Sequence, residues 1–103
     1  MVAAITNFGA VRAARVKSQY MQDKGYFAHK APDGTTPWNL IKAQGVTYWA
    51  AGENIAKGFT NSDAAEKGFM NSAGHRANIL NKDYTHVGIG IVGNLFTQEF
   101  AGF

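Results

Sequence analysis

The stretch THVGIGIVGNLFTQEFA, residues 85–101, decides the fold. Side chains alternate between the two faces of a strand, and the first half of this stretch places apolar side chains on one face, at Val87, Ile89 and Ile91. A second apolar run, residues 95–101, follows directly after Gly93-Asn94. A two-residue connection with glycine in its first position is typical of a tight β-hairpin. The stretch therefore predicts two antiparallel strands.

The same stretch contains a pattern that resembles a nucleotide-binding motif. Residues 88–93 read G-I-G-I-V-G and match G-x-G-x-x-G. That motif needs a helix directly after the glycines and an acidic residue about 20 positions further on. Here a strand follows, and ten residues remain after Gly93. We therefore expect no dinucleotide site, and we expect the glycines to let another element approach the sheet closely.

Helical patterns precede the hairpin. Residues 11–24 are rich in Ala, Arg and Lys and stop at Gly25, a good terminating residue. Thr36 and Pro37 have the chemistry of an N-cap and a first helical position, and they open a short helix that ends at Gly45. Residues 46–58 have no helical period, and we expect a strand with a turn around Gly52-Glu53-Asn54.

Two further helices are predicted between this strand and the hairpin. Asp63 and Glu66 resemble a capping box that opens a helix through Met70. Ser72 can cap a short helix over residues 74–80, whose last two residues, Ile79 and Leu80, would face inward. Helices followed by a terminal hairpin indicate an α+β fold with helices packed on a small antiparallel sheet.

Composition narrows the classes of protein. A chain of 103 residues supports one domain, and a hydrophobic content of 46% is too high for a disordered chain. No apolar run approaches the roughly 20 residues that cross a bilayer, so we expect no transmembrane segment, and no targeting signal is recognisable. The absence of cysteine excludes disulfides, thiolate zinc sites and a cysteine nucleophile.

The net charge of +3 comes from the first 30 residues, which hold five basic side chains against the single acid Asp23. On a helix, Arg12 and Arg15 share a face, whereas Lys17 and Lys24 point away from it. We interpret these groups as a solvated surface, because a phosphate-binding stripe would need them on one face. Nucleic acid is therefore not an expected partner.

Three titratable residues stand out as candidates for a site: His29, Glu53 and His75. Two imidazoles and a carboxylate could hold a divalent metal with open positions for water, or could transfer protons near neutral pH. The competing interpretation is structural, because each residue could simply bond to backbone or to a counter-ion. Glu53 lies among apolar neighbours and needs a cation, a histidine or backbone donors. In the structural interpretation Arg76 anchors a carboxylate such as Glu53 or Asp83; His86 is left out of the site.

Several segments together resemble one protein family. They are Gly25-Tyr26-Phe27-Ala28-His29, Pro32-Asp33-Gly34, Gly52-Glu53-Asn54-Ile55-Ala56, residues 70–80 (MNSAGHRANIL), residues 84–90 (YTHVGIG) and Thr97-Gln98-Glu99-Phe100. In this order and spacing the chain resembles the bacterial branch of the CAP superfamily, also called the SCP domain. The resemblance runs from about Val11 to the C-terminus.

The resemblance implies an α-β-α sandwich in a secreted or cell-surface protein. It also implies a cleft lined by two histidines and acidic residues that binds a divalent cation in several members, Zn²⁺ being preferred here and Mg²⁺ or Ca²⁺ being possible. The matching positions are His29, Glu53 and His75. Ser72 stands where the eukaryotic branch has a second acid, and Phe69 stands where a Trp is common. The ligand-binding residues expected beside them are Asn54, Ser72 and Arg76.

Family domains normally open with a helix and a loop before the segment that matches Val11, whereas residues 1–10 alone precede it here. We therefore expect either a second copy that completes this helical layer or an exposed apolar surface in its place.

Three functions remain open at this point. The leading hypothesis is a secreted or surface domain whose cleft binds a divalent metal or a small extracellular ligand, with no established reaction. A second is a metal-assisted hydrolase in which the histidines hold Zn²⁺ and Glu53 acts as general base. A third is a structural interaction module of the cell envelope.

Overall fold

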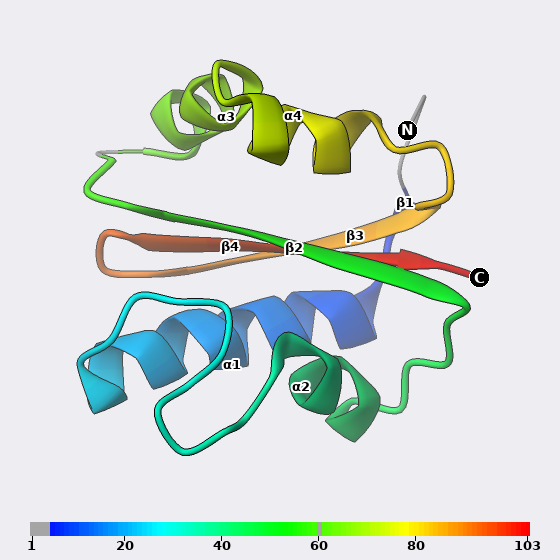
Figure 1. The fold of residues 1–103 in the computed structure, drawn as a ribbon, viewed down its shortest axis with the longest axis horizontal. Helices are drawn as coiled ribbons and strands as arrows, with labels where there is room; N and C mark the ends of the chain where they lie inside the picture. The colour runs from blue at the N-terminus through cyan, green and yellow to red at the C-terminus, as the bar shows by residue number, and fades with distance from the viewer. Residues whose placement is uncertain (1–4, 60) are drawn as a thin grey trace.

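The computed structural model describes residues 5–59 and 61–103, and it has three layers. A four-stranded sheet lies between helices α1 and α2 on one face and helices α3 and α4 on the other (Figure 1). The elements are β1 (Ile5–Thr6), α1 (Phe8–Lys24), α2 (Pro37–Ala43), β2 (Ala50–Lys57), α3 (Ser62–Met70), α4 (Ala73–Leu80), β3 (His86–Val92) and β4 (Leu95–Gly102). This arrangement confirms the predicted α+β sandwich.

The predicted hairpin forms the centre of the sheet. β3 and β4 pair antiparallel from His86 opposite Ala101 to Val92 opposite Leu95, and Gly93 in the turn has a φ of 59°. β2 pairs antiparallel with the other side of β4, and β1 pairs parallel with β3, so the strand order is β1-β3-β4-β2. β4 is therefore the inner strand between β3 and β2, and all its residues are buried.

Close packing between α1 and β3 explains the glycines of the rejected motif. A Cβ on Gly88 would lie 2.0 Å from the backbone carbon of Ala10, and one on Gly90 would lie 2.2 Å from the backbone nitrogen of Arg15. Ser18 bridges the same interface, with its Oγ 3.0 Å from the oxygen of Gly90 and 2.8 Å from Oγ1 of Thr97. The predicted close approach is thus confirmed, and the approaching element is α1.

The first helix begins three residues earlier than predicted, at Phe8, because the Asn7 side chain accepts a hydrogen bond from the Ala10 amide. It ends as predicted at Gly25, which adopts the left-handed conformation. The expectation that Lys17 is solvated is wrong: its residue is 1% exposed. Lys17 lies on the buried face of α1 with the small residues Ala10, Ala13 and Ala14.

Two more local predictions need correction. β2 runs without interruption through residues 52–54, so the turn expected there is absent, because these residues pair with β4 along their whole length. α3 begins at Ser62 with Asn61 as its N-cap, since the Asn61 side chain accepts from the Ala64 amide. Asp63 therefore lies in the first turn of the helix.

Helix α4 differs from the prediction at two positions, its N-cap Ser72 and its last residue Leu80. Ser72 occupies the N-cap of α4 but makes no side-chain capping bond. Ile79 packs against the cluster of Ala56, Ala65, Phe69 and Phe96, as predicted. Leu80 is 55% exposed, and so the prediction that it faces inward is wrong.

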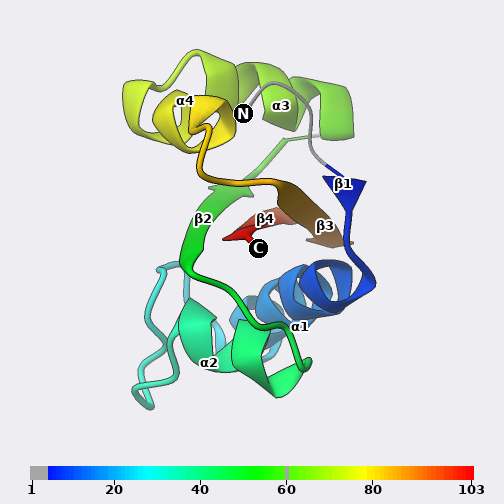
Figure 2. The ribbon, with the colours of Figure 1, turned by 90° about the vertical axis from the view of Figure 1, so that its right-hand side faces the viewer.

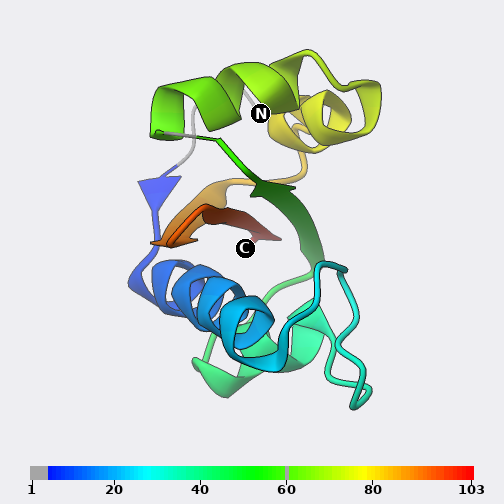
Figure 3. The same cartoon turned by 90° about the vertical axis from the view of Figure 1, so that its left-hand side faces the viewer.

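The two side views show how the helical layers cover the sheet (Figures 2 and 3). Ile89 and Ile91 alternate with the glycines of β3 and so face away from α1, yet they are 49% and 40% exposed. β3 therefore presents an apolar surface on the side of α3 and α4. In the described part of the chain, no helix is long and apolar enough to span a membrane.

Candidate functional site

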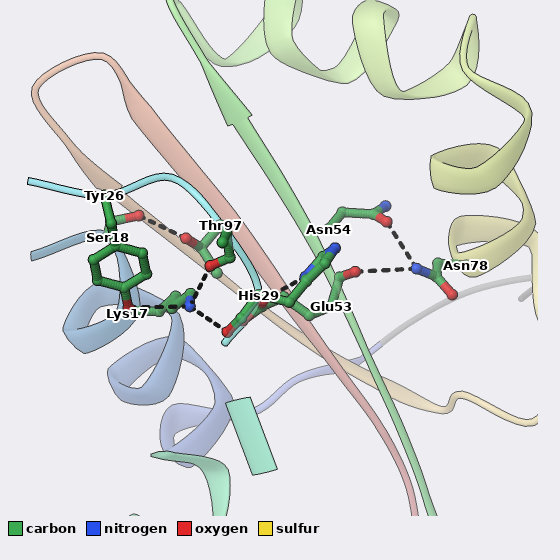
Figure 4. Close-up of polar contacts among 9 residues, drawn as sticks. Lys17, Ser18, Tyr26, His29, Glu53, Asn54, Asn78 and Thr97 are labelled. Carbon is green, nitrogen blue, oxygen red and sulfur yellow. Dashed lines mark hydrogen bonds and ion pairs between the residues drawn. The ribbon is translucent and has the colours of Figure 1, made fainter. Parts of the chain in front are cut away.

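Glu53 lies in the middle of β2 and is 5% exposed. Its Oε1 accepts a hydrogen bond from Nδ1 of His29, at 2.7 Å (Figure 4). His29 is therefore the partner that the Glu53 carboxylate needs in its apolar surroundings. The Glu53 backbone carbonyl accepts a hydrogen bond from the Asn78 side chain of α4, at 3.1 Å, and this bond links β2 to the layer formed by α3 and α4.

His29 lies in the loop that follows α1, and the side chain of Lys17, a residue of α1, holds this loop in place by hydrogen bonds. The Lys17 ammonium donates to the backbone oxygens of Ala28 and His29, at 2.7 and 2.6 Å, and to the Tyr26 hydroxyl, at 3.2 Å. The His29 side chain is 59% exposed, whereas that of Glu53 is 1% exposed. Because Nδ1 bonds to Glu53, the ring nitrogen left for a ligand is Nε2.

His75 comes to the same place from the first half of α4. Its Nδ1 lies 2.9 Å from Oγ of Ser72, and its ring packs at a tilt against Phe69, with 5.0 Å between the ring centroids. Ser72 thus orients the histidine, and this contact replaces the capping bond that the sequence predicts. Here too Nε2 is the ring nitrogen left without a protein partner among the described residues.

A buried amide network holds α4 against the sheet. Nδ2 of Asn54 donates to the backbone oxygen of His75 and to Oε1 of Gln98, both at 3.0 Å, and Oδ1 of Asn54 accepts from Asn78 at 2.8 Å. Gln98 in turn donates to Glu66 of α3, at 2.7 Å. The network fixes the position of His75 relative to Glu53 and His29.

These groups line one pocket of about 260 Å³, formed by His29, Glu53, Asn54, Ser72, Gly74, His75 and Asn78. Five of the six predicted site residues therefore come together. The structure does not bring Arg76 to the pocket, and its exposed guanidinium donates to the backbone oxygen of Met70. Arg76 also anchors no carboxylate, since the ion pair found among the described residues joins His29 and Glu53. His86 bonds to Thr85 and stacks on Phe103, outside the pocket lining.

Sequence reasoning missed two ionisable residues beneath this pocket, Lys17 and Glu99. Burial lowers the pKa of Lys17, and the neighbouring carboxyl groups of Glu53 and Glu99 oppose that shift. A signal for Lys17 was present, because Ala13, Ala14, Lys17 and Met21 follow the spacing of one helix face. Glu99 follows Leu95 and Thr97 at alternate positions of β4, which places it on the α1 side of the sheet.

The residues present fit a divalent cation in one specific way. Both imidazole side chains belong to residues that line the pocket, and a ligating histidine typically donates its other ring N–H to a carboxylate or another acceptor, as His29 does to Glu53. No three His, Cys, Asp or Glu residues of the described chain are grouped so that they could hold an ion. The described residues therefore offer at most two imidazole ligands at this pocket, one of which is hydrogen-bonded to Glu53.

Comparisons with known proteins agree with this architecture. A family model described as CAP, the cysteine-rich secretory protein family, matches residues 7–100. The uncharacterized protein YkwD of Bacillus subtilis is 48% identical over 93 residues, which cover 88% of this chain and 36% of YkwD. The uncharacterized membrane protein YlbC of the same organism is 37% identical over 83 residues, covering 81% of this chain and 24% of YlbC. The chain thus spans about a third or less of these curated relatives.

Two solved structures share the fold. An extracellular protein of Bacillus anthracis that contains an SCP domain matches with a TM-score of 0.94 and 33% identity, over 97% of this chain and 34% of that one. An outer surface protein of Borrelia burgdorferi matches with a TM-score of 0.86 and 17% identity, over 96% of this chain and 77% of that one. With the family match over nearly the whole length, these findings confirm the resemblance seen in the sequence: the chain belongs to the CAP family.

Proposed function

We propose that this chain is a secreted or cell-surface binding domain whose pocket holds a divalent cation through Nε2 of His29 and Nε2 of His75. One observation carries the proposal. Nδ1 of each ring is bonded to a side chain of the protein, Glu53 or Ser72, which leaves Nε2 as the ring nitrogen for a ligand, and both histidines line the same pocket. The open coordination positions would take water or a small extracellular ligand.

The donor chemistry favours Zn²⁺ over the other ions. Imidazole nitrogen suits Zn²⁺, whereas Mg²⁺ and Ca²⁺ prefer several oxygen ligands. Two of the side-chain oxygens near the histidines are already engaged, since Oγ of Ser72 bonds to His75 and Oδ1 of Asn54 accepts from Asn78. We therefore expect Zn²⁺ to bind more tightly than Mg²⁺ or Ca²⁺.

The position of Glu53 favours binding over hydrolysis. A general base must reach the water that it activates, within about 3 Å. Oε1 of Glu53 accepts from His29, and Oε2 is buried away from solvent. Glu53 is therefore suited to orient the ring of His29.

Calorimetric titration of Zn²⁺ at pH 7.5, with Mg²⁺ and Ca²⁺ in parallel, tests the proposal. We expect a one-site isotherm for the wild type and its loss in His29→Ala and in His75→Ala. Glu53→Gln should weaken Zn²⁺ binding by about 10- to 100-fold, because it changes the partner of a ligating histidine. His86→Ala is the matched control, since His86 does not line the pocket, and it should bind like the wild type.

Two results would contradict the proposal. One is the absence of heat with all three ions in the folded wild type. The other is unchanged Zn²⁺ binding in both pocket variants. Either result would leave the histidines as parts of a hydrogen-bonded scaffold in an interaction module.

Location and self-association belong to the same proposal. The family description and the extracellular and outer-surface neighbours support a place outside the cytoplasm. Association of two copies stays a prediction, and the exposed Ile89 and Ile91 on β3 are the surface that it would cover. A monomer in light scattering at high protein concentration would contradict it.

A further inference from the structure

Glu99 and Glu53 face each other across two neighbouring strands. The register of β2 and β4 places Glu53 directly opposite Glu99. The backbone oxygen of Glu53 accepts from Asn78 of α4, so it points out of the sheet edge and away from β4. Glu53 and Glu99 are therefore a non-hydrogen-bonded pair, the type in which opposite side chains approach most closely.

Three carboxyl oxygens of this pair are buried without a hydrogen-bond donor: Oε2 of Glu53 and both oxygens of Glu99. Glu99 is 0% exposed. Two adjacent ionised carboxylates in such a place would repel each other and would lack compensating donors, which is a costly arrangement. A proton on one carboxyl group removes the repulsion and supplies the missing donor.

Lys17 cannot supply that donor. An ammonium has three N–H groups, and those of Lys17 are taken by the oxygens of Ala28, His29 and Tyr26. Lys17 therefore contributes one positive charge beneath the pair and no hydrogen bond to it. One positive charge balances one carboxylate, which leaves the second carboxyl group best accommodated as a neutral acid.

We propose that Glu99 is a neutral carboxylic acid at neutral pH and donates its hydrogen to Oε2 of Glu53. The pair then carries a single negative charge on Glu53, whose Oε1 stays available to the Nδ1–H of His29. Glu99 is thus a positioning residue, because it keeps Glu53 in the state that directs Nε2 of His29 to the pocket. Its importance for ligand binding rests on the proposed function, whereas its protonation does not.

The balance of the effects on Glu99 favours its neutral form. Burial raises the pKa of Glu99 well above its usual value, Glu53 raises it further, and Lys17 lowers it by a smaller amount. These two side chains, Lys17 from α1 and Glu53 from β2, are the charged groups that act on it. Its partner on β3 is Gly88, which has no side chain.

Infrared spectroscopy of the metal-free protein tests the protonation directly. We expect the carbonyl band of a protonated carboxylic acid in the wild type at pH 7 and its loss in Glu99→Gln, in which an amide keeps the donor to Glu53. Asp63→Asn, which removes an exposed carboxyl group, is the control and should keep the band. Absence of the band in the wild type, or its persistence in folded Glu99→Gln, would overturn the proposal.

A pH series provides a second test that needs no metal. An unfolded glutamate releases its proton near pH 4.5, whereas folded Glu99 keeps its proton to higher pH. Between these two values the folded state binds more protons, so stability falls as pH rises. The urea midpoint of the wild type should therefore fall relative to that of Glu99→Gln between about pH 5 and pH 8. If the urea midpoints of the wild type and of Glu99→Gln changed equally with pH over this range, the assignment would be contradicted.

Carbon-13 labelling of the glutamate carboxyl groups in the wild type covers the case in which Glu99→Gln does not fold. The Glu99 carboxyl carbon should keep the chemical shift of the acid form at pH 7, and a carboxylate shift would refute the proposal.

The positioning role of Glu99 is tested by rescue of Zn²⁺ binding. Glu99→Leu, which has no donor, should weaken Zn²⁺ binding by about 10- to 100-fold, and Glu99→Gln should restore it. Equal Zn²⁺ affinity in the wild type and Glu99→Leu would reject the role for ligand binding alone.

Discussion

Replacing Lys17 with methionine should lower the free energy of unfolding by about 3–5 kcal/mol, because it leaves buried carboxyl groups without a nearby positive charge and carbonyl oxygens without their donor. Methionine keeps much of the apolar volume but removes the positive charge beneath Glu53 and Glu99. It also removes the donor to the backbone oxygens of Ala28 and His29. The substitution therefore acts on the core and on the loop that carries His29.

Urea unfolding at pH 7 measures this loss. Lys24→Met is the matched control, because Lys24 is an exposed lysine at the end of the same helix. The control should change the free energy of unfolding by less than about 1 kcal/mol, as surface substitutions do. If Lys17→Met and Lys24→Met were equally stable, the account of Lys17 as the buried counter-charge would be wrong.

The second large effect is expected at Gly88. An alanine Cβ there would lie 2.0 Å from the Ala10 carbonyl carbon and 2.1 Å from the Val11 nitrogen, both backbone atoms of α1. No rotamer change relieves a clash with backbone, so α1 must move away from the sheet. We expect a loss of about 3 kcal/mol or more in the free energy of unfolding, at the upper end of overpacking substitutions.

Gly74→Ala provides the opposite case for the same experiment. Gly74 lies in α4, and nothing comes within 4 Å of the Cβ that alanine would add there. Because alanine is the better helix former, this variant should be as stable as the wild type or up to about 1 kcal/mol more stable. Thermal unfolding of both variants decides the matter, and a Gly88→Ala variant with the wild-type melting temperature would refute the close packing of α1 on β3.

Local chemistry in the sequence accounts for much of the fold. The alternation in residues 85–101, the Gly93 turn and the stop at Gly25 are patterns that short-range sterics and hydrogen bonding dictate, and the structure follows them. The turn expected at residues 52–54 failed for a different reason. Glycine and asparagine favour turns locally, but pairing with β4 outweighs that preference.

The candidate site could be predicted in part. The spacing of His29, Glu53 and His75 says nothing about which of them touch, and the expectation that they share a cleft came from the family resemblance. The role of Lys17 escaped because charged side chains are usually exposed, although its helix position matches the buried face. Glu99 escaped because its partner, Glu53, is distant in sequence and becomes its neighbour through strand pairing.

Nitrogen-15 NMR of the three imidazoles during Zn²⁺ addition tests the central claim most directly, because it reports each ring nitrogen separately. The account predicts that the Nε2 signals of His29 and His75 shift together with one equivalent of Zn²⁺, while their Nδ1 signals keep the protein-bonded state and His86 does not respond. Shifts at Nδ1, at His86 alone or at none of the rings would contradict it.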